Sequence, residues 1–145
     1  MSLTEVSRLM IENAVQRAIV TLWAALDGGD FEAVAGSFSN DGVWHRQGKR
    51  LAGRNEVRAA MSERPKSART RHLVTNTLVN IVDENSAEMQ FYLTVYQHTA
   101  DPADAPPPAP MNVPLTVALA HASVRKEAAG WKIQELRSAD TFRRK

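Results

Sequence analysis

The sequence changes its hydrophobic period once, about halfway along the chain. In residues 5–26 the apolar side chains recur every three or four positions, which is the spacing of one face of an α-helix. From residue 70 onward apolar and polar side chains alternate, as they do in strands with one buried face. Helices followed by antiparallel strands predict an α+β domain in which N-terminal helices pack on one face of a sheet.

Capping and turn residues divide the first half into helices. Thr4 is a suitable N-cap for the long helix, and the Gly-Gly pair after residue 27 supplies the backbone that ends it. A second helix is expected over 31–38 and a third over about 55–63. The sequence Ser-Asn-Asp-Gly at 39–42 predicts a turn between them, followed by a short strand.

The second half is expected to hold four strands, at 70–82, 87–98, 114–125 and 131–137. Residues 101–114 contain six of the seven prolines, and proline cannot donate to a strand ladder. This segment is therefore expected to be an extended connection, which can act as a stiff surface loop, as the rim of a ligand pocket or as a contact with a partner subunit.

Composition excludes several classes of protein. The 145 residues are 43% hydrophobic and 23% charged, which indicates one soluble domain over residues 1–145. The absence of cysteine excludes disulfide scaffolds, thiol nucleophiles and thiolate metal sites. No apolar run is long enough for a membrane span, and no secretory signal is recognisable, so a cytoplasmic protein without membrane association is expected.

The basic character of the chain comes from its C-terminus. Removing the three positive charges of the tail at 143–145 takes the net charge from +2 to −1. The rest of the sequence shows no basic stripe with interleaved aromatic residues, so nucleic acid is not expected as a partner. The tail itself is expected to be a frayed, solvated end.

Two residues form a candidate acid–base pair. Asp27 ends the long helix, and His72 lies early in an expected strand. A histidine can accept a proton near neutral pH, and a carboxylate bonded to its other ring nitrogen fixes the tautomer. Strand alternation places His72, Val74, Asn76 and Leu78 on one face, which would bring His72 and Asn76 into a mainly apolar pocket if that face meets the helices. Without such contacts, Asp27 is a helix cap and His72 a satisfied strand residue.

Signatures of cofactor and metal binding are missing. The sequence has no G-x-G-x-x-G, no Walker loop and no H-E-x-x-H. The four histidines lie far apart along the chain, so neither a metal nor a cofactor is expected.

Several short motifs together resemble a known family. They are 26–31 (Leu-Asp-Gly-Gly-Asp-Phe), 38–44 (Phe-Ser-Asn-Asp-Gly-Val-Trp), Gly53, 69–76 (Arg-Thr-Arg-His-Leu-Val-Thr-Asn) and 130–133 (Gly-Trp-Lys-Ile). Their order is similar to that of the SnoaL-like branch of the nuclear transport factor 2-like superfamily, over essentially the whole chain. The resemblance implies a cone-shaped fold, with a strongly curved mixed sheet around the helices and a deep pocket between them.

The resemblance also implies roles for individual residues. Asp27 and His72 match the aspartate–histidine pair of scytalone dehydratases and hexachlorocyclohexane dehydrochlorinases, where the pair accepts a proton in an elimination. His98 resembles a second pocket histidine of the dehydratases after one inserted residue, which makes it a third catalytic candidate. Arg137 falls near an arginine that assists halide departure in the dehydrochlorinases. The candidate substrate-binding residues are Trp23, His45, Asn76, Tyr96 and Arg137.

Two functions remain open at this stage. One is a cofactor-independent lyase, or an isomerase, acting on a small, cyclic, largely apolar molecule. The other is a non-catalytic ligand-binding module or a structural partner, because 71–76 also resembles the β subunits of aromatic-ring-hydroxylating dioxygenases. Epoxide hydrolysis and polyketide cyclisation occur on the same fold, and the fold alone does not choose among them.

A homo-oligomer, either a dimer or a trimer, is expected to form through the sheet. Met89, Phe91, Leu93 and Val95 share one strand face, which is too apolar to leave in water if the opposite face covers the helices. If Tyr92 points outward instead, these four residues belong to the core. Related folds commonly associate through the sheet in either case.

Overall fold

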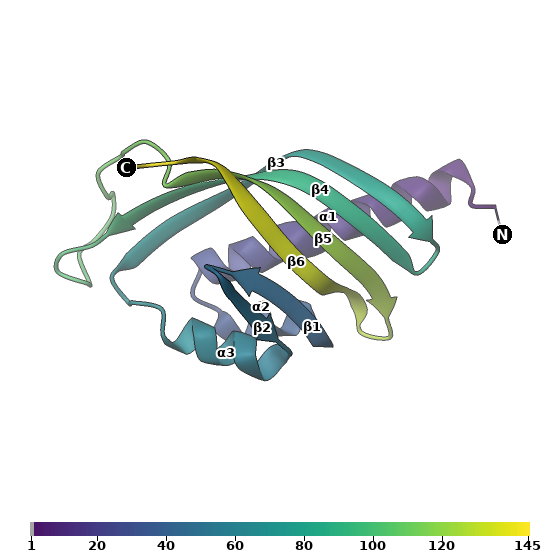
Figure 1. Ribbon diagram of the computed structural model, residues 1–145, viewed down its shortest axis with the longest axis horizontal. Coiled ribbons are helices and arrows are strands. Elements are labelled where there is room, and N and C mark those ends of the chain that lie inside the picture. The colour runs from purple at the N-terminus through teal and green to yellow at the C-terminus, as the bar shows by residue number, and fades with distance from the viewer. Residues whose placement is uncertain (1) are drawn as a thin grey trace.

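The computed structural model describes residues 2–145 as three helices packed against one six-stranded sheet (Figure 1). The helices are α1 (Glu5–Asp27), α2 (Phe31–Gly36) and α3 (Arg54–Ser62). The strands are β1 (Phe38–Arg46), β2 (Lys49–Ala52), β3 (Ala68–Asp83), β4 (Ser86–Thr99), β5 (Thr116–Glu127) and β6 (Gly130–Arg143). The strand order is β2-β1-β6-β5-β4-β3, with β1 parallel to β6 and the other neighbours antiparallel. The α+β prediction is confirmed.

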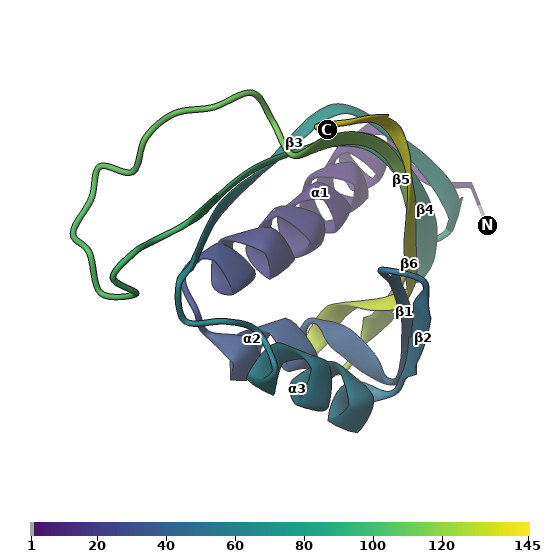
Figure 2. The same cartoon turned by 60° about the vertical axis from the view of Figure 1, so that its left-hand side comes forward.

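The sheet curves around α1, and α2 and α3 close the same side near β1 and β2 (Figure 2). The apolar residues of β4, among them Met89 and Phe91, are buried at 1% and 0% exposure against the helices. Tyr92 consequently lies on the outer face, 45% exposed. The apolar face of β4 therefore belongs to the core, and it is not available for subunit contacts.

Helix α1 is the central element of the core, although only part of it is buried. Thr4 caps it by accepting a hydrogen bond from the Ser7 backbone N–H at 3.1 Å, as expected. Its buried residues are Val15, Ile19, Leu22, Trp23 and Leu26. Val6 and Leu9 were expected on the same buried face, but they are 67% and 59% exposed because the first turns extend past the sheet (Figure 1).

The turn expected at 39–42 is part of β1, and α2 ends at Gly36 instead of residue 38. The pairing of β1 with β6 shifts register between Phe38 and Val43, so these polar residues lie in an irregular stretch of strand. A Cβ at Gly42 would lie 2.7 Å from the Ile133 carbonyl oxygen. Glycine is therefore required here by the close approach of two strands.

Strand β3 contains a bulge that reverses its inward and outward faces. Between the paired positions Thr75 and Leu78 it has one residue more than β4, and Asn76 has φ +51°. Asparagine tolerates this left-handed conformation better than most residues do. Beyond the bulge Leu78 is 66% exposed and Val79 packs against the core. The prediction that Asn76 and Leu78 share the face of His72 is therefore wrong.

The C-terminal tail is not frayed. Arg143 ends β6, and the Arg144 backbone N–H donates to the Leu115 carbonyl at 2.8 Å. The Arg144 guanidinium also donates to the carbonyl oxygens of Val113 and Gln97. These bonds fix the tail to the start of β5 and the end of β4.

The proline-rich segment extends away from the body between β4 and β5 (Figure 2).

None of the described helices is long and apolar enough to cross a membrane.

Candidate functional site

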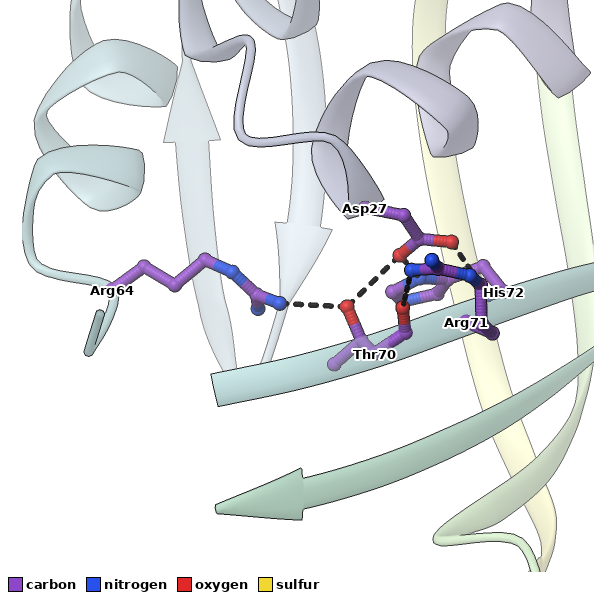
Figure 3. Close-up of polar contacts among 5 residues, drawn as sticks. All are labelled: Asp27, Arg64, Thr70, Arg71 and His72. Atoms are coloured by element: carbon purple, nitrogen blue, oxygen red, sulfur yellow. Dashed lines mark hydrogen bonds and ion pairs between the residues drawn. The ribbon is translucent and has the colours of Figure 1, made fainter. Parts of the chain in front are cut away.

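The C-terminal end of α1 meets the beginning of β3, and this contact joins Asp27 to His72. Asp27 Oδ1 lies 2.6 Å from His72 Nδ1, and Asp27 Oδ2 accepts the His72 backbone N–H at 2.8 Å (Figure 3). The Thr70 hydroxyl donates to Asp27 Oδ1 at 2.9 Å. The side chains of His72 and Asp27 are only 9% and 11% exposed. The carboxylate therefore holds both the ring and the backbone of His72.

The bonding pattern defines the charge of Asp27 and the tautomer of His72. Burial raises the pKa of Asp27, but hydrogen bonds from His72 and Thr70 and the charge interaction with His72 outweigh burial and leave the pKa of Asp27 below its ordinary value. An ionised carboxylate only accepts hydrogen bonds, so we infer that Nδ1 of His72 carries the proton. Among the hydrogen bonds of residues 2–145, none involves His72 Nε2. Nε2 is thus the nitrogen that can act as a base.

His72 lines a pocket of about 860 Å³ between the sheet, the end of α1 and the β1–β2 turn. Its ring stacks on Trp23, with 4.4 Å between centroids and 16° between planes. Trp23 in turn meets Trp44 edge to face at 5.9 Å. The apolar part of the lining is Trp23, Leu26, Trp44, Leu93, Val95, Leu115 and Ala118. A base with a fixed ring orientation therefore borders a pocket whose lining is partly apolar and partly polar.

Two half-buried arginines, Arg46 and Arg64, line the same pocket. Arg64, which follows α3, donates to the Thr70 hydroxyl at 2.7 Å, so a continuous chain of bonds runs from Arg64 through Thr70 to Asp27 (Figure 3). Arg46, at the end of β1, lies over the Trp44 ring at 5.5 Å. Burial lowers the pKa of both guanidinium groups, and the charge of Arg64 lowers the pKa of Arg46 further. The nearby charge of Asp27 acts in the opposite direction on the pKa of Arg64.

Neither arginine is among the candidate residues predicted from the sequence, and only Arg46 left a signal there. Arg46 lies two residues after Trp44 on a strand, so both side chains point toward the same face of the sheet. Arg64 follows a helix in an irregular segment, where no periodicity indicates its direction.

Tyr96 and His98 lie outside this pocket, contrary to the expectation for both. They alternate with Val95 and Gln97, which do line it, so they project from the opposite face of β4. They border a separate pocket of about 710 Å³, whose other wall is the proline-rich loop. The one-residue insertion needed to align His98 with a pocket histidine explains the error, because a shift of one residue moves a strand side chain to the other face.

His45 and Arg137 are also directed away from the pair. His45 borders the pocket at the β1–β2 end, but its Nε2 lies 3.2 Å from Glu135 Oε2. Arg137 is 62% exposed and lies 3.7 Å from Glu135 Oε1. Asn76 lies in the exposed bulge of β3. Of the candidate residues, the structure therefore brings Trp23, Asp27 and His72 together.

Residues 2–145 contain no group of three His, Cys, Asp or Glu side chains placed to hold a metal ion.

A curved mixed sheet wrapped around one long helix, with a pocket between them, defines the nuclear transport factor 2-like class of proteins with the cystatin-like fold. Within that class the chain belongs to the SnoaL-like domain family, whose family model matches residues 7–137. The resemblance found in the sequence motifs is confirmed. No match was found among curated proteins.

Solved structures similar to this chain include a substituted form of a Mycobacterium tuberculosis protein of unknown function, with 21% identity, TM-score 0.78, and coverage of 91% of this chain and 77% of that chain. Hexachlorocyclohexane dehydrochlorinase LinA-type3 of Novosphingobium barchaimii has 13% identity, TM-score 0.78, and coverage of 97% and 93%. A protein of Novosphingobium aromaticivorans, named provisionally as a scytalone dehydratase, has 17% identity, TM-score 0.77, and coverage of 96% and 89%. At these identities the similarity establishes the fold.

Proposed function

We propose that this protein is a cofactor-independent lyase that removes a proton and a leaving group from adjacent carbons of a small cyclic molecule. The observation that carries the proposal is the Asp27–His72 pair, whose ring is held by a 2.6 Å contact at Nδ1 while Nε2 has no bond from residues 2–145. Two of the similar structures bear names of eliminating enzymes, which supports the same reaction class.

The reaction uses the free ring nitrogen as its base. His72 Nε2 takes a proton from carbon, the electrons of the broken C–H bond form a C=C bond, and the leaving group departs with the electrons of its own bond. A halide leaves as the anion, whereas a hydroxyl group leaves as water after the His72 imidazolium gives it the proton taken from carbon. Asp27 stays ionised and stabilises the imidazolium that forms. General-base catalysis of this kind contributes about 10²–10⁴-fold to the rate.

The surroundings of His72 assist this role. The stack on Trp23 fixes the plane of the imidazole, and the bond to the Asp27 carboxylate fixes its rotation. Burial of the pair, whose side chains are only 9% and 11% exposed, strengthens the interaction between the carboxylate and the imidazolium.

The proposal is tested with a panel of cyclic hydroxyketones and cyclic halides. For 3-hydroxycyclohexanone the product is a conjugated enone that can be followed by its absorbance, and for the halides the released anion is measured. We expect turnover by the wild-type protein, loss of turnover in His72→Gln, and retention in His121→Gln, a matched control on the outer face of β5. Equal turnover in the wild-type protein and His72→Gln would refute the proposed base.

A ligand-binding module without turnover is the second candidate. It is favoured by the placement of Tyr96 and His98 outside the pocket, which leaves His72 without the second pocket histidine that the resemblance implied. Binding of panel compounds without any product would support this alternative. A structural role beside a ring-hydroxylating dioxygenase predicts instead a stable complex with the large subunit of such an enzyme.

A further inference from the structure

The pocket that contains His72 has an excess of positive charge. Its lining includes the cations Arg46, Lys49, Arg50, Arg64 and Arg143 and one acid, Asp140. Arg143 and Asp140 form an ion pair with each other. Among the ion pairs of residues 2–145, none involves Arg46 or Arg64.

Arg46 and Arg64 differ from the other cations in being half-buried. Lys49 and Arg50 are exposed, so water solvates their charges. A guanidinium group that is partly removed from water and has no carboxylate partner is in an unfavourable electrostatic environment. The lowered pKa of both arginines reflects this burial. An anion in this pocket that interacts with both guanidinium groups would compensate for the lost solvation.

We propose that Arg46 and Arg64 form a subsite that binds a carboxylate group of the ligand. The planar fork of a guanidinium matches the two oxygens of a carboxylate, and such charged hydrogen bonds are stronger than neutral ones. This inference deepens the proposed function, on which it rests, because it names the charge class of the substrate: a small apolar ring that bears a carboxylate.

The subsite is linked to the base through two side chains, Thr70 and Asp27. Arg64 donates to Thr70, and Thr70 donates to the carboxylate that holds His72. Arg46 reaches the same pocket across Trp44, whose ring forms part of the apolar lining. A ligand that places its ring against the tryptophans can therefore direct a carboxylate toward the arginines. The two arginines would thus select and orient the substrate, while His72 would carry out the proton transfer.

The test compares two probes that differ in charge, cyclohexanecarboxylate and cyclohexanecarboxamide, by titration calorimetry with the purified protein. Losing a hydrogen bond to a charged group weakens binding about 10-fold to 100-fold. We expect the wild-type protein to prefer the carboxylate by at least about 10-fold. Arg46→Gln and Arg64→Gln should each lose most of this preference. Arg17→Gln removes the same charge from an exposed site on α1, and this control variant should retain the preference for the carboxylate.

Circular dichroism of each variant reports whether it is folded. Arg46→Lys provides a second variant that keeps the charge but loses the planar fork. Arg46→Lys should bind the carboxylate more weakly than the wild-type protein and more tightly than Arg46→Gln. Equal affinity for the two probes in the wild-type protein, or binding of neither, would overturn the subsite.

His72→Gln separates this inference from the proposed function. It should keep the carboxylate preference while losing turnover of the panel compounds. A preference that persists without His72-dependent turnover, either of the panel compounds or of their ring-carboxylate derivatives, would leave the subsite standing and refute the lyase. Turnover that depends on His72 in a wild-type protein with no preference would refute the subsite alone.

Discussion

The substitution Asp27→Asn is expected to move the proton of His72 from Nδ1 to Nε2. In the wild-type protein both carboxylate oxygens accept hydrogen bonds, Oδ2 from the His72 backbone N–H and Oδ1 from Thr70 and His72 Nδ1. An amide has one acceptor and one donor group. The backbone N–H has no alternative tautomer, so the amide oxygen should take that bond and the NH₂ group should face the ring. His72 then has to accept at Nδ1.

The size of the tautomer preference follows from the bond that is lost. A hydrogen bond to a charged group contributes about 1.5–3 kcal/mol, which favours the Nδ1–H tautomer about 10-fold to 100-fold in the wild-type protein. In Asp27→Asn the neutral bond favours the opposite tautomer by about 1 kcal/mol. The proton on Nε2 would block the base, and a comparable change in hydrolase triads lowers the rate about 10⁴-fold. The expected loss of folding stability is only about 1–3 kcal/mol.

Long-range ¹H–¹⁵N correlation spectra at alkaline pH, where imidazoles are neutral, distinguish the two tautomers without any substrate. The wild-type spectrum should show His72 protonated at Nδ1, and the Asp27→Asn spectrum should show it protonated at Nε2. His121 serves as an internal control and should not change. A wild-type His72 that carries its proton on Nε2, or a variant that keeps it on Nδ1, would refute the reasoning.

Three further outcomes are expected. The folded-state pKa of Asp27 lies below its ordinary value of 3.8, so its stabilising contribution is present above that value and is lost as pH falls toward the folded pKa. In urea unfolding at acidic pH, the free energy of unfolding should therefore fall more steeply with pH in the wild-type protein than in Asp27→Asn. Asn76→Gly should leave the free energy of unfolding nearly unchanged. Asn76→Val should lower it by about 1–2 kcal/mol, because a β-branched residue is strained at positive φ. Equal stability of the two variants would contradict this expectation. The homo-oligomer stays a prediction, now placed on the outer face where Leu73, Tyr92 and Phe142 are 42%, 45% and 68% exposed; sedimentation velocity should show an oligomer that Tyr92→Glu dissociates, and a monomeric wild-type protein would contradict it.

Local patterns in the sequence predicted the fold class well. The three-to-four spacing of α1 and the alternation of β4 and β5 depend on neighbouring residues, so the sequence contains them directly. The turn at 39–42 was wrong for a tertiary reason. Turn-forming residues at this position allow β1 to bend and approach β6 closely at Gly42, and only the pairing of the two strands shows this.

The site was predicted less completely, because side-chain direction in strands depends on counting residues. The bulge at Asn76 adds one residue to β3, and the alignment of His98 required one inserted residue in β4. Each change of one residue in the count moves the side chains that follow to the other face of the sheet. His72 escapes this problem because it precedes the bulge of β3, and Asp27 does because it lies at the end of a helix. Arg46 and Arg64 line the same pocket from the end of a strand and from a loop, and no periodicity indicates that these two segments meet there.

The bond between Asp27 and the backbone of His72 also bears on aggregation. Strand β3 is the last strand in the order of the described sheet, so it has an edge without a neighbouring strand. Free backbone N–H groups on such an edge can pair with a strand of another molecule and start a polymer. Asp27 Oδ2 occupies one of these groups, and the end of α1 covers the edge beside it. A substitution that removes this acceptor altogether, such as Asp27→Ala, should therefore make concentrated solutions of the protein more prone to form β-rich aggregates.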